Sequence, residues 1–138
     1  MQAHRKPCLA CALALGVLAA APAMAGPYDQ PYSIIQTERT RSSDPDVIPV
    51  IINRVDDETI RSRPNDAVVA PGPHQVTVDV PPRKGFHLAT QNTFDLVTEP
   101  CTRYYVSARL RTRTTQDWEP FVRNKERIGE CQKKFGVS

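Results

Sequence analysis

Apolar and polar residues alternate one by one along much of the chain after residue 33, and a period of two is the pattern of β-strands. The clearest case is HQVTVDV, residues 74–80, in which the valines at 76, 78 and 80 share one side and polar residues share the other. The chain also contains 13 prolines, which interrupt any long helical pattern. We therefore expect strands joined by turns.

The longest alternating stretch is CTRYYVSARLRTR, residues 101–113. One side of this stretch is apolar and consists of Tyr104, Val106, Ala108 and Leu110. The other side is mostly cationic and consists of Arg103, Tyr105, Ser107, Arg109, Arg111 and Arg113. Because a helix would scatter the arginines around its axis, the stretch is expected to be a long strand with an apolar inner face.

The segment that follows is expected to return beside this strand. TTQD, residues 114–117, is a turn signal, and WEPFVRNKERIGEC, residues 118–131, is expected to be a last extended segment. Cys101 would then begin one strand and Cys131 would end the next, with similar lengths on either side of the turn near Thr115. Antiparallel pairing in that register brings the two cysteines together.

The other strands are expected to be short, at residues 34–41, 47–55, 59–63, 66–70, 74–80, 86–90 and 93–99. VIPVIINRV, residues 47–55, is apolar on both faces at its middle, which favours a central strand. Pro49 then requires a bulge or an unpaired N–H. The number and spacing of the segments predict an all-β fold, a small immunoglobulin-like β-sandwich of about seven strands.

The first 25 residues are expected to be a secretory signal peptide that lies outside the fold. A short polar start is followed by an apolar run, LACALALGVLAAAP, and by the small-x-small cleavage site Ala23-Met24-Ala25. The run is shorter than the ~20 residues that span a bilayer. Cys8 and Cys11 precede the run, whereas a lipidated cysteine would follow it.

The mature chain is therefore expected to be periplasmic or secreted. Residues 26–46 would form an N-terminal lead-in with a candidate first strand, and residues 47–138 would form one β-sandwich domain. No segment after the signal peptide is long and apolar enough to span a membrane.

Cys101 and Cys131 are the two cysteines left after removal of the signal peptide. In an oxidising compartment we expect them to form one disulfide, which would contribute about 3–4 kcal/mol by the chain-entropy model. A free catalytic or metal-binding thiol is the alternative. It lacks support, because the chain has no CxxC motif and neither mature histidine lies at ligand spacing from a cysteine.

The charges of the mature chain nearly cancel but are unevenly distributed. Residues 26–100 contain 7 basic and 11 acidic residues, and residues 101–138 contain 9 basic and 4 acidic residues. Basic strands beside acidic ones within a single domain would explain this difference. A basic face for an acidic polymer is the alternative explanation. Nucleic acid is not expected as a partner, because no binding motif is present and the domain is not strongly basic.

Two stretches of the sequence resemble known families. VAPGPHQVTVDV, residues 69–80, resembles the proline-glycine turn and following strand of PEGA-like modules, which are small β-sandwich domains of bacterial envelope proteins. EPCTRYYVSARL, DWEPFV and ERIGEC together resemble the C-terminal half of small secreted proteobacterial proteins of uncharacterised function. The resemblance spans residues 47–131 and departs at Asp56-Asp57, where a glycine-containing turn is usual. It implies a PEGA-like β-sandwich and an exported location, and it implies no activity.

Candidate catalytic and metal-binding residues are few. His74 follows a turn, His87 lies in a short expected strand, and neither has an evident catalytic partner. No GxSxG elbow and no phosphate-binding glycine-rich loop is present. A loop-edge calcium site built from acids of residues 44–46 and 56–58 is an alternative without EF-hand spacing. We therefore expect no enzyme activity, no cofactor and no metal.

The first functional hypothesis is an exported, non-catalytic β-sandwich that takes part in envelope structure or binding. Its candidate anion- or partner-binding face consists of Arg103, Tyr105, Arg109, Arg111, Arg113 and Trp118. Packing in the core is the alternative for Trp118, and a solvated, ion-paired face is the alternative for the arginines. The second hypothesis is a periplasmic inhibitor or accessory subunit that binds a protein partner through an edge strand.

Overall fold

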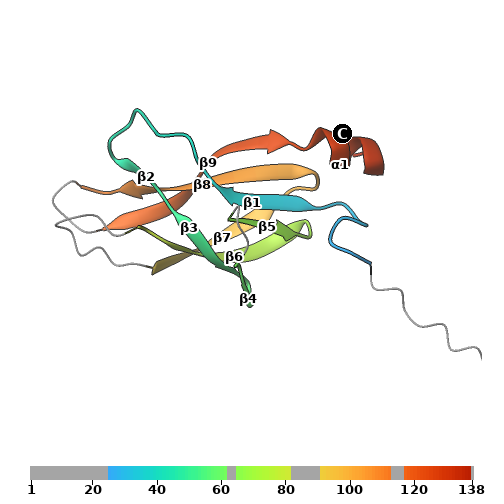
Figure 1. Ribbon diagram of the computed structural model, residues 1–138, viewed down its shortest axis with the longest axis horizontal. Helices are drawn as coiled ribbons and strands as arrows, with labels where there is room; N and C mark the ends of the chain where they lie inside the picture. The colour runs from blue at the N-terminus through green and yellow to red at the C-terminus, as the bar shows by residue number, and fades with distance from the viewer. Residues whose placement is uncertain (1–24, 62–64, 82–90, 113–116, 138) are drawn as a thin grey trace, which may run out of the picture.

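The computed structural model describes residues 25–61, 65–81, 91–112 and 117–137 (Figure 1). This part of the chain contains nine strands and one helix: β1 (Ser33–Thr37), β2 (Val47–Pro49), β3 (Ile51–Val55), β4 (Glu58–Thr59), β5 (Asp66–Val69), β6 (Gly72–Asp79), β7 (Gln91–Thr98), β8 (Thr102–Leu110), β9 (Trp118–Arg127) and α1 (Gly129–Phe135). The prediction of a mostly β fold is confirmed. The expected signal peptide and the expected strand at 86–90 lie outside the described residues, apart from Ala25.

The strands form two sheets, which we name sheet A and sheet B. Sheet A has the order β2-β8-β1-β5, with β9 also paired to β8, and sheet B has the order β4-β3-β6-β7. β1 is parallel to residues 103–106 of β8, and β2 is antiparallel to residues 107–109. Since β9 pairs with β8 from residue 102 to residue 110, β1 and β2 share the opposite edge of β8.

The two sheets share one hydrophobic core. Sheet A contributes Ile35, Ile48, Ala67, Val106, Ala108 and Trp118. Sheet B contributes Ile52, Val55, Val76 and Val78, and the residues Val50 and Val80, which flank its strands, complete the core. The alternation of the sequence at 76–80 and 104–110 thus corresponds to inner and outer faces, as predicted. Burial of each large aliphatic side chain stabilises the fold by roughly 1.5–3 kcal/mol.

The segment 47–55 differs from its prediction as one central strand. Residues 47–49 form β2 in sheet A, and residues 51–55 form β3 in sheet B. The chain crosses between the sheets at Val50, so Ile48, Val50 and Ile52 all face the shared core. Pro49 is the last residue of β2. A proline is tolerated at such a position because it has no N–H to donate to a neighbouring strand.

The end of the chain also differs from its prediction. The last extended segment stops at Arg127, and Cys131 lies in α1 rather than at the end of a strand. Local signals favour this helix, because Glu130 is in its first turn, Lys133 and Lys134 are in its last turn, and Gly136 ends it in the left-handed region. No helix of the described ranges is long and apolar enough to cross a membrane.

Helix α1 covers a second hydrophobic cluster, which consists of Tyr32, Ile34, Cys101, Ile128 and Cys131 with Val68, Phe135 and Val137 against it. Ile34 and Ile35 are neighbours in β1, so their side chains lie on opposite faces of sheet A. The second cluster is therefore on the outer face. Figure 1 shows α1 near the N-terminal end of β1, and Lys134 Nζ donates to the Tyr28 carbonyl at 2.6 Å.

The predicted disulfide between Cys101 and Cys131 is present, with the two Cα atoms 5.3 Å apart. Cys101 has a left-handed backbone with φ 54°. Its N–H donates to the Tyr32 carbonyl at 2.8 Å, and its carbonyl accepts from Ile128 N–H at 2.8 Å. This one residue therefore links the crossover from β7 to β8 with the start of β1, the end of β9 and α1.

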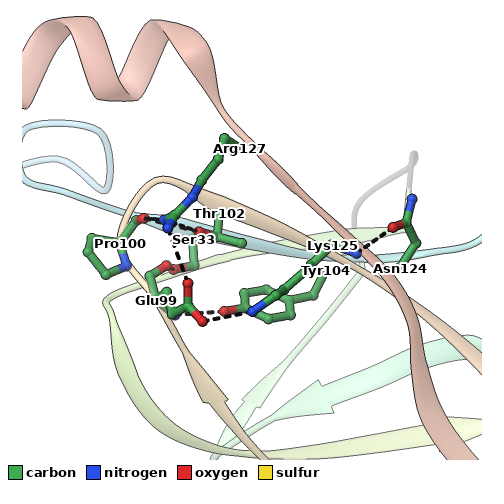
Figure 2. Close-up of polar contacts among 8 residues, drawn as sticks. All are labelled: Ser33, Glu99, Pro100, Thr102, Tyr104, Asn124, Lys125 and Arg127. Carbon is green, nitrogen blue, oxygen red and sulfur yellow. Dashed lines mark hydrogen bonds and ion pairs between the residues drawn. The ribbon is translucent and has the colours of Figure 1, made fainter. Parts of the chain in front are cut away.

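A cluster of polar side chains also binds the crossover from β7 to β8 (Figure 2). The Tyr104 hydroxyl accepts the Glu99 N–H at 2.8 Å, and Ser33 Oγ donates to the Glu99 carbonyl at 2.6 Å. The Glu99 carboxylate lies 2.9 Å from Lys125 Nζ and 3.5 Å from Arg127. The hydrogen bond from Lys125 is the largest cause that lowers the pKa of Glu99, and Arg127 acts in the same direction.

Removal of the disulfide is expected to destabilise the mature chain strongly. The bridge joins residues separated by 30 positions. The double variant Cys101→Ala/Cys131→Ala should lose about 3–4 kcal/mol of unfolding free energy, because the unfolded chain regains loop entropy. Urea denaturation of residues 26–138 measures this loss. Two alkylatable thiols in the native, unreduced protein would contradict the bridge.

The Glu99 cluster predicts a pH dependence of stability. The pKa of Glu99 is lowered from its ordinary value of 4.5, so the folded chain binds this proton more weakly than the unfolded chain. The stabilisation is therefore present at neutral pH and is lost as the pH falls below that value. Wild type should exceed Glu99→Gln in unfolding free energy at pH 7, and the difference should shrink as the pH falls below 4.5. The exposed Asp95→Asn, which lies on β7 outside the Glu99 cluster, is the matched control for loss of a carboxylate.

Candidate functional site

The candidate face of β8 lies on the outer side of sheet A. Tyr104, Val106 and Ala108 are buried on the inner side, whereas Arg109 is exposed and Arg103 and Tyr105 are half-buried. Ser107 is buried although it belongs to the outer row, and it lines a cavity together with the chain between β1 and β2. Arg113 lies outside the described residues.

Glu126 of β9 binds two residues of this face. Arg103 and the Tyr105 hydroxyl each donate to Glu126 Oε1 at 2.8 Å. The hydrogen bond from Tyr105 is the main cause that lowers the pKa of Glu126, and burial is the main cause that raises the pKa of Tyr105. Arg103 and Tyr105 are therefore engaged within the protein.

Arg109 of β8 and Arg111, which directly follows this strand, also have internal partners. Arg109 lies over the Phe121 ring at 4.8 Å, and Arg111 pairs with Glu119 at 3.3 Å. Both are exposed, and an exposed ion pair contributes only ~0–1 kcal/mol. An external anion therefore displaces little when it binds Arg109 or Arg111.

Trp118 does not contribute its ring to this face. The side chain is only 5% exposed and belongs to the shared core. Its carbonyl accepts from Asn92 Nδ2 at 3.1 Å, which connects the first residues of β7 and β9. Of the two roles that the sequence left open for Trp118, the structure shows packing.

A groove beside this face contains three further arginines. A cavity of about 530 Å³ lies on the outer side of sheet A, bordered by the loop of residues 38–46, by β2, by Ser107 and by Arg123. We call this the arginine groove, after Arg39, Arg41 and Arg123 in its lining. The loop lies toward the end of the molecule opposite α1 (Figure 1).

A bulge in β9 directs Arg123 toward this groove. Asn124 is opposite Tyr105 and Val122 is opposite Val106, so Arg123 is the extra residue between them. Bulges change the direction of a side chain and often lie near functional sites. Arg123 donates to the Thr40 carbonyl at 3.2 Å and thereby connects β9 to the loop.

The acidic residues of the loop bind its own backbone. Glu38 Oε1 accepts the Thr40 N–H at 2.9 Å, and Asp44 Oδ1 accepts the Asp46 N–H at 3.0 Å. Arg39 and Arg41 are exposed, and no acid of the described residues forms an ion pair with them. The groove therefore offers guanidinium groups for an external anion.

The other candidate residues do not gather at this groove. His74 Nδ1 lies 2.8 Å from Asp56 Oδ2 and His74 Nε2 lies 2.7 Å from the Ala70 carbonyl, while His87 is outside the described residues. The acids at 44–46 border the loop after β1, whereas those at 56–58 form the turn between β3 and β4. Across the described ranges, no group of three or more His, Cys, Asp or Glu has the arrangement of a metal site.

Comparisons with protein-family models, with curated proteins and with solved structures find no match for this chain.

Proposed function

We propose that this chain is an exported, non-catalytic β-sandwich protein of immunoglobulin-like or PEGA-like type that binds an anionic polymer of the cell envelope. Two sheets around one core support the sandwich. Tyr104 supports the immunoglobulin-like type, because a tyrosine near the start of a strand whose hydroxyl bonds upstream backbone resembles a tyrosine corner.

Export to the periplasm or beyond is supported by the disulfide and by the apolar start of the sequence. A Cys101–Cys131 bridge is compatible with an oxidising compartment. The apolar run and small-x-small site at residues 9–25 are typical of a cleaved signal peptide.

The arginine groove is the observation that carries the binding proposal. Its arginines come from two separate segments, are exposed around a cavity of about 530 Å³, and adjoin the exposed Arg109. Planar guanidinium groups bind carboxylates and phosphates through paired hydrogen bonds. A polymer with repeated anionic groups would engage the groove and the β8 face at the same time.

Salt and charge should control this binding. We expect residues 26–138 to co-sediment with purified peptidoglycan or with outer-membrane fractions at low salt, and to be released at about 0.5 M salt as exposed charges are screened. Arg39→Ser/Arg41→Ser should weaken binding about five- to thirtyfold, since each exposed pair contributes roughly 0.5–1 kcal/mol. A salt series of co-sedimentation measures both effects.

The control variant Arg54→Ser/Lys133→Ser removes the same charge at exposed positions away from the groove and should bind as wild type. The variant Arg109→Ser/Arg111→Ser measures the contribution of the β8 face to binding separately from that of the groove. If the groove variant and the control lose the same amount of binding, net charge and not the groove explains the co-sedimentation. No pelleting at low salt would refute polymer binding.

A further inference from the structure

A second cavity lies at the open side between the two sheets. It has a volume of about 710 Å³, within the range of ligand pockets. Its lining includes two runs of consecutive residues, 55–61 and 66–70, together with Pro27 and His74. Alternate residues of a strand face opposite sides, so consecutive lining means that strand edges border the cavity. We call this cavity the edge cleft.

Both walls of the edge cleft have an open strand edge. β5 pairs with β1 on one side, and no other described strand pairs with it. β4 pairs with β3 alone within the same described ranges. An open edge presents backbone N–H and C=O groups to which an extended segment can bind as an added strand.

Side-chain hydrogen bonds tie the walls together at the two ends of the edge cleft. His74 bridges Asp56 of the hairpin wall and the Ala70 carbonyl after β5, at 2.8 and 2.7 Å. At the other end, the Asn65 amide binds Ile52 through both of its backbone groups, at 2.6 and 2.8 Å. A preformed site avoids part of the entropy that ordering would cost on binding.

The chemistry of the lining specifies the occupant. Its apolar residues include Val55, Ile60, Ala67 and Val69, which belong to the shared core or pack against it. Among the described residues, its acidic residues are Asp56, Asp57, Glu58 and Asp66, and Arg61 is its one lysine or arginine. Asp57 and Glu58 are exposed at the hairpin tip, whereas Asp56 is bound by His74 and by the Gln75 N–H.

We propose that the edge cleft binds an extended segment of a partner protein, which adds a strand to the open edge of β5 and places apolar side chains inward and basic side chains against Asp57 and Glu58. The alternation of apolar and basic residues follows from the period of a strand. This inference does not rest on polymer binding, because the edge cleft has the opposite charge and lies on other strands.

A second copy of this chain is a poorer occupant of the edge cleft. Pairing of two β5 edges would bring together the acids of both copies, and like charges disfavour such contacts.

The other sheet edges are poorer sites for an added strand. The β9 edge is protected by Pro120, by the bulge at Arg123 and by charged residues. The β7 edge adjoins a cavity of only about 240 Å³.

The test uses a labelled peptide of alternating valine and lysine with residues 26–138 in the disulfide-bonded form. Fluorescence anisotropy measures affinity, and hydrogen exchange measures protection of individual amides. We expect salt-sensitive binding and slower exchange of outward-facing amides within β5. A valine–glutamate peptide should bind at least about tenfold more weakly because its charge repels the rim. A backbone N-methylated valine–lysine peptide should lose binding because it cannot pair with the strand edge.

Two variants complete the test. Asp57→Asn/Glu58→Gln should weaken the valine–lysine peptide about five- to thirtyfold, by the loss of two exposed charge pairs. The matched control Asp95→Asn/Glu130→Gln removes equal charge at exposed positions outside the edge cleft and should bind as wild type. Arg39→Ser/Arg41→Ser should also leave peptide binding unchanged, which separates this site from the arginine groove.

Three outcomes would overturn the proposal. The first is no binding at about millimolar peptide, the affinity scale of the weakest specific contacts. The second is an equal loss of binding in Asp57→Asn/Glu58→Gln and in the control. The third is protection from exchange on β7 or β9 instead of β5, or protection that depends on dimerisation of the chain.

Discussion

Cys101 joins four parts of the chain through its backbone and its sulfur. Its N–H binds Tyr32 before β1, its carbonyl binds Ile128 after β9, and its sulfur binds Cys131 in α1. The residue itself lies at the crossover from sheet B to sheet A, in a left-handed conformation with φ 54°. The pairing of β1 with β8 and the position of α1 on the outer face therefore both depend on this crossover.

This arrangement separates two surfaces of opposite charge. The outer face of sheet A carries the arginine groove, with Arg123 placed by the bulge in β9. The edge cleft, between β5 and the β3–β4 hairpin, contains four of the 11 acidic residues of positions 26–100. The two surfaces lie on different strands of one fold, and we propose that the first binds anions and the second binds cations.

Local patterns succeeded where a residue and its neighbours contain the information. The alternation at 74–80 and at 102–110 predicted strands with the correct inner faces, because burial of valine on one side of a sheet forces a period of two. The same patterns missed the division of 47–55, since a run that crosses between sheets keeps its period while its partners change. They also missed α1, although Glu130, Lys133, Lys134 and Gly136 are helix signals in the sequence.

The sequence alone predicted that the fold is rich in strands, that Cys101 and Cys131 pair, and that β8 carries a row of cations. These features follow from residue type and spacing. Only the tertiary structure decided which cations face solvent without an ion-pair partner among the described residues. Arg103 meets Glu126 across a strand pair, whereas Arg39 and Arg41 lie beside Arg123 from a segment more than 80 residues away, as the Arg123–Thr40 separation of 83 shows. Likewise, β1 pairs with one edge of β5, and no other described strand pairs with the second edge. These contacts between distant segments are set by packing, and no local pattern contains them.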